Sequence, residues 1–179
     1  MKNTVNVGIS DMKIVSSPDT VATYALGSCV GICIIDKIKQ VAGMVHIMLP
    51  QNPNPSDTKV LFKYADTGIA EMVRQLEKNG CLRMRMTAKI AGGAKMFEVS
   101  DDKNSTIGNI GERNVIAVKK VLQDMKIRLI AEDTGLNYGR TIFFDSSNGE
   151  LLVKSFAKGN KRLYLTALEH ETASSPDVP

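Results

Sequence analysis

Two apolar runs joined by a short polar segment constrain the fold of this chain more than any other feature of its sequence. Val30–Asp36 and Val41–Leu49 are rich in β-branched residues, and only the segment Lys37-Ile38-Lys39-Gln40 separates them. Runs of this length and composition are typical of strands, and so short a connection favours an antiparallel hairpin. The rest of the chain must be organised around this hairpin.

The hairpin brings a cysteine close to one of the two histidines of the chain. If Asp36 faces Val41, Gly31 lies opposite His46. Cys29 is then the diagonal neighbour of His46 on the same face, because residues two apart along a strand point the same way. Diagonal pairs lie roughly 7–8 Å apart at the backbone, a gap that two side chains can bridge. We expect Gly31 to leave the space between them empty. A connection with an odd number of residues would place the two side chains on opposite faces.

A thiol beside an imidazole is a candidate nucleophile with its base. A free cysteine has a pKa of about 8.5, and an imidazole within hydrogen-bond distance accepts the proton to make the thiolate. Gly27 and Ser28 form a tight turn before Cys29, and such a turn exposes the thiol and aims backbone N–H groups at a developing oxyanion. We expect the N–H of Cys29 and a neighbour in this turn to form that oxyanion hole. Thr23, at the end of the preceding strand, is the candidate to orient the imidazole of His46.

A structural role for these residues is the alternative. Cysteine is among the most buried residue types, and a single histidine on a strand is usually structural. Cys33 and Cys81 have no histidine at a comparable position, so we expect core or surface positions for them. Three cysteines without paired spacing fit a reducing cytosol. We expect no metal, because Cys29, Cys33 and His46 lack a fourth ligand or a CxxC pair. A cysteine nucleophile with a histidine base would also need no cofactor.

Apolar, β-branched runs predict further strands, and apolar stripes with a 3.6-residue period predict two helices. Two long helices among many strands, several of them in successive hairpins, predict an α/β sandwich with a mixed, largely antiparallel sheet. The expected strands are Val5–Ile9, Lys13–Val15, Thr20–Leu26, Met84–Ala91, Ile127–Glu132, Thr141–Asp145 and Glu150–Lys154, and the expected helices are Lys59–Lys78 and Glu112–Met125.

Three connecting segments carry further expectations. The loop Gln51–Thr58, with two prolines and two asparagines, starts shortly after His46 and should border the site. It either recognises a substrate or merely connects strand to helix. Gly92-Gly93 could cradle an anion, but close packing beside the cysteine turn explains the pair better. Ser100–Asn109 is polar and is expected to form a mobile loop.

The length and the net charge of the chain limit the number of domains and the kind of partner that we expect. A chain of 179 residues suits one domain. The net charge of +4 favours an acidic protein surface as partner. It is too small to predict a surface that binds nucleic acid, so we expect no nucleic-acid partner. No apolar run approaches 18 residues and no signal peptide is present, which predicts a cytoplasmic protein without membrane insertion. No heptad pattern argues for obligate assembly, so the free protein is expected to be a monomer.

Several blocks, taken together and in order, resemble the CheD family, the chemoreceptor glutamine deamidases of bacterial and archaeal chemotaxis. The resemblance covers roughly Val5–Ser155. One departure stands at Gly135-Leu136, where the family usually has a Gly-Gly pair, so this loop could differ in shape. The blocks are Leu26-Gly27-Ser28-Cys29-Val30, Asp36, His46-Ile47-Met48-Leu49-Pro50, Ala88 to Phe97, Ile110-Gly111-Glu112-Arg113-Asn114, Asp133-Thr134-Gly135 with Gly139-Arg140, and Asn148-Gly149-Glu150 with Val153-Lys154.

The resemblance implies a fold, a site and an activity. The fold would be a single-domain, three-layer α/β/α sandwich over residues 1–168, followed by a disordered Ser- and Pro-rich tail at 169–179. The catalytic residues would be Cys29, His46 and Thr23, the same three that the residue pattern selects. The activity would convert glutamine side chains of a chemoreceptor (a methyl-accepting chemotaxis protein) into glutamate and ammonia, without a cofactor, at receptor arrays.

Other functions remain open from sequence. The resemblance also implies binding to a CheC-type phosphatase of the phosphorylated response regulator, so the chain could act chiefly as an interaction protein. A methyl esterase acting on receptor glutamyl esters would use the same nucleophile. A thiol-redox protein is disfavoured, because Cys29 has no resolving cysteine at CxxC spacing.

Overall fold

The two apolar runs form a hairpin at the centre of a five-stranded sheet in the computed structural model, which describes residues 1–96 and 109–163. Strands β4 (Val30–Asp36) and β5 (Val41–Ile47) pair antiparallel, as predicted, and every residue of both strands is buried. We call the sheet around them the inner sheet. Its other strands are β2 (Met12–Ser16), β6 (Met86–Gly92) and β7 (Arg128–Thr134), in the order β2-β5-β4-β6-β7.

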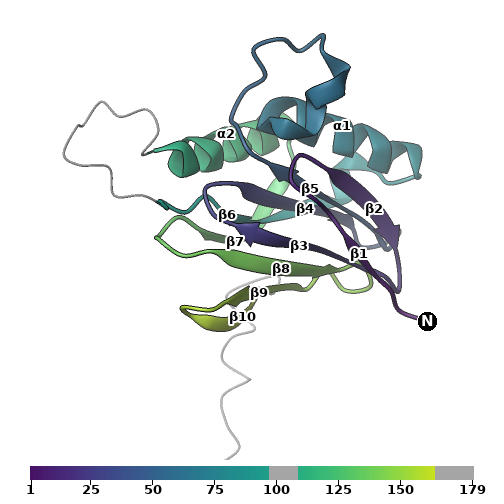
Figure 1. Ribbon diagram of the computed structural model, residues 1–179. Helices are drawn as coiled ribbons and strands as arrows, with labels where there is room; N and C mark the ends of the chain where they lie inside the picture. Colours follow the sequence, from purple (N-terminus) through teal and green to yellow (C-terminus); the bar gives the residue numbers. More distant parts are fainter. Residues whose placement is uncertain (97–108, 164–179) are drawn as a thin grey trace, which may run out of the picture.

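A second five-stranded sheet, the outer sheet, covers one face of the inner sheet (Figure 1). Pairing is antiparallel in both sheets, except that β1 runs parallel to β3 and β6 runs parallel to β7. The strands of the outer sheet are β1 (Thr4–Asn6), β3 (Thr20–Leu26), β8 (Arg140–Asp145), β9 (Leu151–Ser155) and β10 (Gly159–Leu163), in the order β1-β3-β8-β9-β10.

The two long helices cover the opposite face of the inner sheet (Figure 1). Ile69 and Val118 of the helices pack in one apolar cluster with Ile32 of β4. Met44 and Phe144 belong to a second cluster, which lies between the two sheets. The helices are α1 (Ala65–Lys78) and α2 (Ile110–Asp124), and two short 3₁₀ turns, η1 (Thr58–Lys63) and η2 (Arg83–Arg85), precede α1 and β6.

The α/β class, the mixed and largely antiparallel pairing and the two long helices are confirmed, but the order of layers corrects the expected α/β/α arrangement. The layers run helices, inner sheet, outer sheet. The reason is visible in β8, where buried and half-buried residues alternate, so the outer sheet buries one face only. Such a sheet covers the central hairpin by itself, and no helix of the described residues lies outside it.

The helix expected over Lys59–Lys78 is interrupted at Tyr64. This residue has an extended backbone, with φ −117° and ψ 147°, and it separates η1 from α1. The carbonyl of Lys63 accepts hydrogen bonds from the N–H groups of Met48 and Leu49. The break therefore lets the chain pair with the segment that follows His46, a long-range contact that helix periodicity does not reveal.

Strand β10 has no counterpart in the prediction, because four of its five residues are exposed and its sequence carries no apolar alternation. The expected loop Ser100–Asn109 falls outside the described residues except for its last residue, and the expected tail at 169–179 falls outside them entirely.

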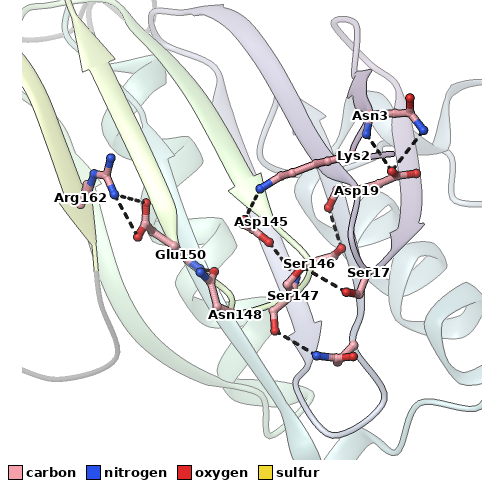
Figure 2. A network of polar contacts seen from close by, with 11 residues as sticks. Lys2, Asn3, Ser17, Asp19, Asp145, Ser146, Ser147, Asn148, Glu150 and Arg162 are labelled. Atoms are coloured by element: carbon pink, nitrogen blue, oxygen red, sulfur yellow. Dashed lines mark hydrogen bonds and ion pairs between the residues drawn. The ribbon is translucent and has the colours of Figure 1, made fainter.

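Polar contacts anchor the start of β3, the strand that carries Thr23 (Figure 2). Both the N–H and the hydroxyl of Ser146 donate to the carbonyl of Asp19, at 3.1 and 2.6 Å. The Asp19 carboxylate accepts from the N–H of Asn3 at 2.9 Å. Lys2 pairs with Asp145 at the end of β8. The chain terminus and the β8–β9 turn are thus fixed against the residue just before β3.

Candidate active site

The three candidate residues come from both sheets and the turn between them. Thr23 lies on β3 of the outer sheet, His46 lies on β5 of the inner sheet, and Cys29 ends the turn that joins β3 to β4. The predicted register is confirmed, because Asp36 pairs with Val41 and Gly31 pairs with His46. The site therefore lies between the sheets at one end of the central hairpin.

The imidazole of His46 is held by the hydroxyl of Thr23. Thr23 Oγ1 lies 2.8 Å from His46 Nδ1 and 2.7 Å from the carbonyl oxygen of Val7. A hydroxyl has one proton, and the carbonyl of Val7 can only accept, so Thr23 donates to Val7 and accepts from Nδ1–H. In the neutral ring the proton then sits on Nδ1 and the lone pair on Nε2. The contact fixes both the tautomer and the orientation of the ring.

The Nε2 atom of His46 is left as a base. It is buried and has no hydrogen-bond partner among the described residues, so Cys29 is not hydrogen-bonded to it. Burial lowers the pKa of His46 to about 4, which keeps the ring neutral at pH 7. Burial also raises the pKa of the half-buried Cys29 thiol, an effect that its own backbone N–H offsets only in part. At neutral pH the pair is thus a thiol and a neutral imidazole.

A β-bulge in β3, between Thr23 and Leu26, lets both of these residues point inward. Thr23 pairs with Ile142 and Leu26 pairs with Arg140, so β3 has one residue more than β8 over this stretch. Residues three apart on a regular strand point to opposite faces, yet Thr23 and Leu26 are both fully buried. The extra residue, with φ +57° at Ala25, restores the inward direction. The sequence alone gave no sign of the bulge.

Glycine residues hold the cysteine turn in place. The N–H of Gly93 donates to the carbonyl of Cys29 at 2.7 Å, and the N–H of Ala94 donates to the carbonyl of Gly27 at 2.8 Å. A Cβ on Gly92, whose φ is +116°, would lie 2.2 Å from the carbonyl oxygen of Cys29. No side chain fits there. The expectation that Gly92-Gly93 packs closely beside the turn is confirmed.

The turn also offers backbone donors for an oxyanion. The N–H groups of Ser28 and Cys29 donate to no carbonyl oxygen within residues 1–96 and 109–163. The N–H of Cys29 interacts with the thiol of the same residue, whereas a half-buried N–H without a partner, as in Ser28, fits a role toward a ligand. Gly27 and Ser28 lie in this turn, between β3 and β4, and their role toward an oxyanion stays a prediction.

Asn114 of α2 is a polar residue at the site that the sequence reasoning did not single out. Its side chain is fully buried, and Nδ2 donates to the carbonyl of Ser28 at 2.9 Å and to that of Met48 at 2.8 Å. One side chain thus joins the cysteine turn to the end of the strand that carries His46. An asparagine on the otherwise apolar inner stripe of α2, together with Val115, Val118 and Leu122, was the available signal.

The space beside Gly31 is occupied rather than empty, which corrects one expectation. A Cβ on Gly31 would lie 2.7 Å from Ile142 Cδ1 and 3.2 Å from Leu26 Cδ1. Glycine at this position lets the outer sheet approach the inner sheet closely. That approach brings the Thr23 hydroxyl within reach of His46.

The remaining expectations concern other cysteines, the Gly135-Leu136 loop, metals and membranes. Cys33 and Cys81 are buried in the core, one of the two kinds of position expected for them. Leu136 takes a left-handed backbone with φ +58°, and its carbonyl accepts from the N–H of Lys95. Across the described ranges, no three His, Cys, Asp or Glu residues gather as metal ligands. None of the helices described is long and apolar enough to cross a membrane.

The fold and the site define a class: α/β proteins that place a cysteine at the turn between two sheets, near a buried histidine oriented by a threonine. The comparisons with known proteins narrow this class. A family model described as CheD chemotactic sensory transduction matches residues 48–155, a segment that begins just after His46. The chain belongs to the CheD family.

Relatives extend the match over most of the chain. A protein of Caldanaerobacter subterraneus subsp. tengcongensis is 51% identical over 157 residues, which cover 88% of this chain and 96% of the relative. One of Lachnoclostridium phytofermentans is 47% identical over 163 residues, 91% of this chain and all of the relative. One of Syntrophomonas wolfei is 46% identical over 161 residues, which cover 90% of this chain and 99% of the relative. All three bear the name "Probable chemoreceptor glutamine deamidase CheD".

Proposed function

We propose that the protein is a cysteine-dependent amidohydrolase that converts glutamine side chains of a chemoreceptor into glutamate and ammonia. The observation that carries the chemistry is the hydrogen bond from His46 to Thr23, which leaves the buried Nε2 as a base beside the Cys29 turn. The substrate follows from family membership and from the names of the relatives. The reaction uses the chain's own residues and one water molecule, without a cofactor.

Acylation begins with proton transfer from Cys29 Sγ to His46 Nε2 as sulfur attacks the side-chain amide carbon of glutamine. Without substrate, Cys29 is a thiol and His46 a neutral imidazole. The thiolate and the imidazolium therefore form only when substrate is bound and their charges are stabilised. Thr23 supports the imidazolium by accepting from Nδ1–H. The backbone N–H groups of Ser28 and Cys29 hold the oxyanion. His46 then protonates the leaving nitrogen, and ammonia departs as the thioester forms.

Deacylation reverses the roles of the same groups. Water loses a proton to Nε2 of His46 as it attacks the thioester carbon. The tetrahedral intermediate collapses, the carbon–sulfur bond breaks, and the thiolate takes the proton back from the imidazolium. The product is a glutamate, so each turnover adds one negative charge to the substrate.

Ammonia release from a purified cytoplasmic fragment of a chemoreceptor tests this function. Wild-type protein should release ammonia and raise the mass of the fragment by about one dalton per glutamine, since OH replaces NH₂. In H₂¹⁸O each new glutamate should carry one ¹⁸O. A wild-type protein that leaves the fragment unchanged would overturn the proposal.

Binding to a CheC-type phosphatase, implied by the family resemblance, is a second candidate function. The observation in its favour is an apolar surface beside the cysteine turn. The side chain of Met96, 47% exposed, lies against Gly27, and Leu136 is 65% exposed. In this proposal the protein is a monomer when free and works in the cytoplasm at receptor arrays. Cys29→Ala should abolish ammonia release and leave phosphatase binding intact, whereas Leu136→Asp should weaken binding.

A further inference from the structure

A groove lies between the outward face of α2 and the proline-containing loop that follows β5. Its volume is about 980 Å³. Pro50, Pro53 and Pro55 line one side, and the loop lies beside the helical layer (Figure 1). Ile116 and Ala117 of α2 line the other side. We call this the proline-loop groove. Its walls are a helix and a loop whose backbone is restricted by three prolines.

One end of the groove is linked to the cysteine turn through Asn114. Leu49 is its first lining residue in chain order, and it follows Met48 directly. One amide nitrogen, Asn114 Nδ2, contacts both the carbonyl of Met48 and that of Ser28, the residue before Cys29. A molecule lying in the groove therefore passes within a few residues of the cysteine turn.

The charged residues of the groove have one sign. Arg113 and Lys120 of α2 line it, and none of its described lining residues is Asp or Glu. Lys120 also pairs with Asp124 on the helix surface, but such an exposed pair holds its partners weakly. The smaller cavity on the other side of the start of α2, about 290 Å³, is lined by both Lys95 and Glu112. The proline-loop groove is thus positive where this neighbouring cavity has charges of both signs.

A buried donor adds a polar contact point. Asn52 is 4% exposed and lines the groove, and its Nδ2 has no partner among the described residues. Its Oδ1 accepts from the N–H of Asn54, which fixes the orientation of the amide. A donor left without a partner beside an open groove fits a ligand that supplies an acceptor oxygen.

We propose that the proline-loop groove docks an acidic, amphipathic helix of the substrate protein and so presents its glutamine to Cys29. This inference rests on the proposed function. Arg113 and Lys120 are seven residues apart on α2, about 10 Å along the axis, so they match two carboxylates spaced two turns apart on a partner helix. Tyr64 and Ile116 contact the apolar face of that helix. The groove, rather than the thiol, selects the substrate.

Charge reversal tests the docking. The double variant Arg113→Glu/Lys120→Glu should raise KM for the receptor fragment at least about tenfold and change kcat little, because the cations bind substrate without taking part in chemistry. The matched control is Lys78→Glu/Lys126→Glu, which makes the same charge change at two exposed positions outside the groove. Raising the salt concentration should weaken wild-type binding and leave the groove variant nearly unaffected.

A binding measurement separates this inference from the proposed function. The Kd of Cys29→Ala for the fragment, and for a helical peptide with two glutamates seven residues apart, is compared with and without the groove substitutions. A rise of about tenfold in Kd with the groove pair alone supports docking, whether or not the wild type releases ammonia. An unchanged Kd, or the same rise with the control pair, overturns it. Absence of ammonia release by the wild type overturns the proposed function instead.

Discussion

Replacing Thr23 with valine removes one hydroxyl and tests the tautomer argument without changing the shape of the side chain much. In the wild type the Thr23 hydroxyl accepts from His46 Nδ1–H at 2.8 Å and donates to the carbonyl of Val7 at 2.7 Å. In Thr23→Val the buried Nδ1–H loses its acceptor and the ring is free to change tautomer or turn. Nε2 is then no longer fixed as the base.

The size of the effect follows from the burial of both groups. An unpaired buried donor costs about 1–3 kcal/mol, and hydrogen bonds to a charged group lie at the upper end. His46 carries a charge only during the reaction, so a large part of this cost falls on the transition state. Since about 1.4 kcal/mol is a factor of ten in rate, we expect kcat/KM to fall roughly 10- to 100-fold. Thr23→Ser keeps the hydroxyl and should retain most of the activity.

The assay is the initial rate of ammonia release from the receptor fragment, with the melting temperature measured alongside. The account expects Thr23→Val to lose activity at temperatures well below its own melting transition, with Thr23→Ser close to wild type. Equal activity in wild type and Thr23→Val would refute the role of the hydroxyl. Equal losses in the valine and serine variants would assign the effect to packing.

Three further outcomes follow from the structure. Because burial lowers the pKa of His46 to about 4, the base form is already present above that pH, so the acid limb of kcat/KM should lie near pH 4 rather than 6.5. The raised pKa of Cys29 preserves the reactive thiol–imidazole pair above that limb, so kcat/KM should stay level into the alkaline range, as a pH series on wild type will show. Asn114→Asp keeps the shape of the side chain but removes both donated hydrogen bonds, and should lower kcat/KM about tenfold or more. The control Asn137→Asp, at an exposed position, should leave kcat/KM unchanged. Equal kcat/KM in wild type and Asn114→Asp would count against a positioning role for Asn114. Leu136→Gly should raise the free energy of unfolding by up to about 1 kcal/mol in urea titration, because glycine removes the cost of the left-handed backbone at φ +58°; a loss of stability would show that the leucine contacts outweigh that cost.

The central hairpin and the identity of the candidate residues could be predicted from sequence because both depend on local rules. Strand alternation and the even length of the Lys37–Gln40 connection set the register in which Gly31 faces His46. The family resemblance then assigned Cys29, His46 and Thr23 together. These signals need no knowledge of which layers cover the hairpin.

The features that the sequence did not predict arise from contacts between distant segments. Apolar runs show that the hairpin is covered but not whether a helix or a sheet covers it, so the outer sheet was missed. The bulge in β3 follows from its pairing with β8, and the break at Tyr64 follows from pairing with Leu49. Asn114 reaches the cysteine turn only because α2 packs over the inner sheet. In each case the deciding partner is far along the chain.

The central claim is that Cys29 is the nucleophile. It is tested most directly by comparing the deamidation rates of three variants, each with one cysteine replaced by alanine, on the same receptor fragment. Cys33→Ala and Cys81→Ala are the matched controls, since both cysteines are buried in the core and neither lies at the turn. The account predicts that Cys29→Ala releases no ammonia above the buffer blank, while both controls, assayed below their melting temperatures, retain activity. Measurable release by folded Cys29→Ala would contradict the account.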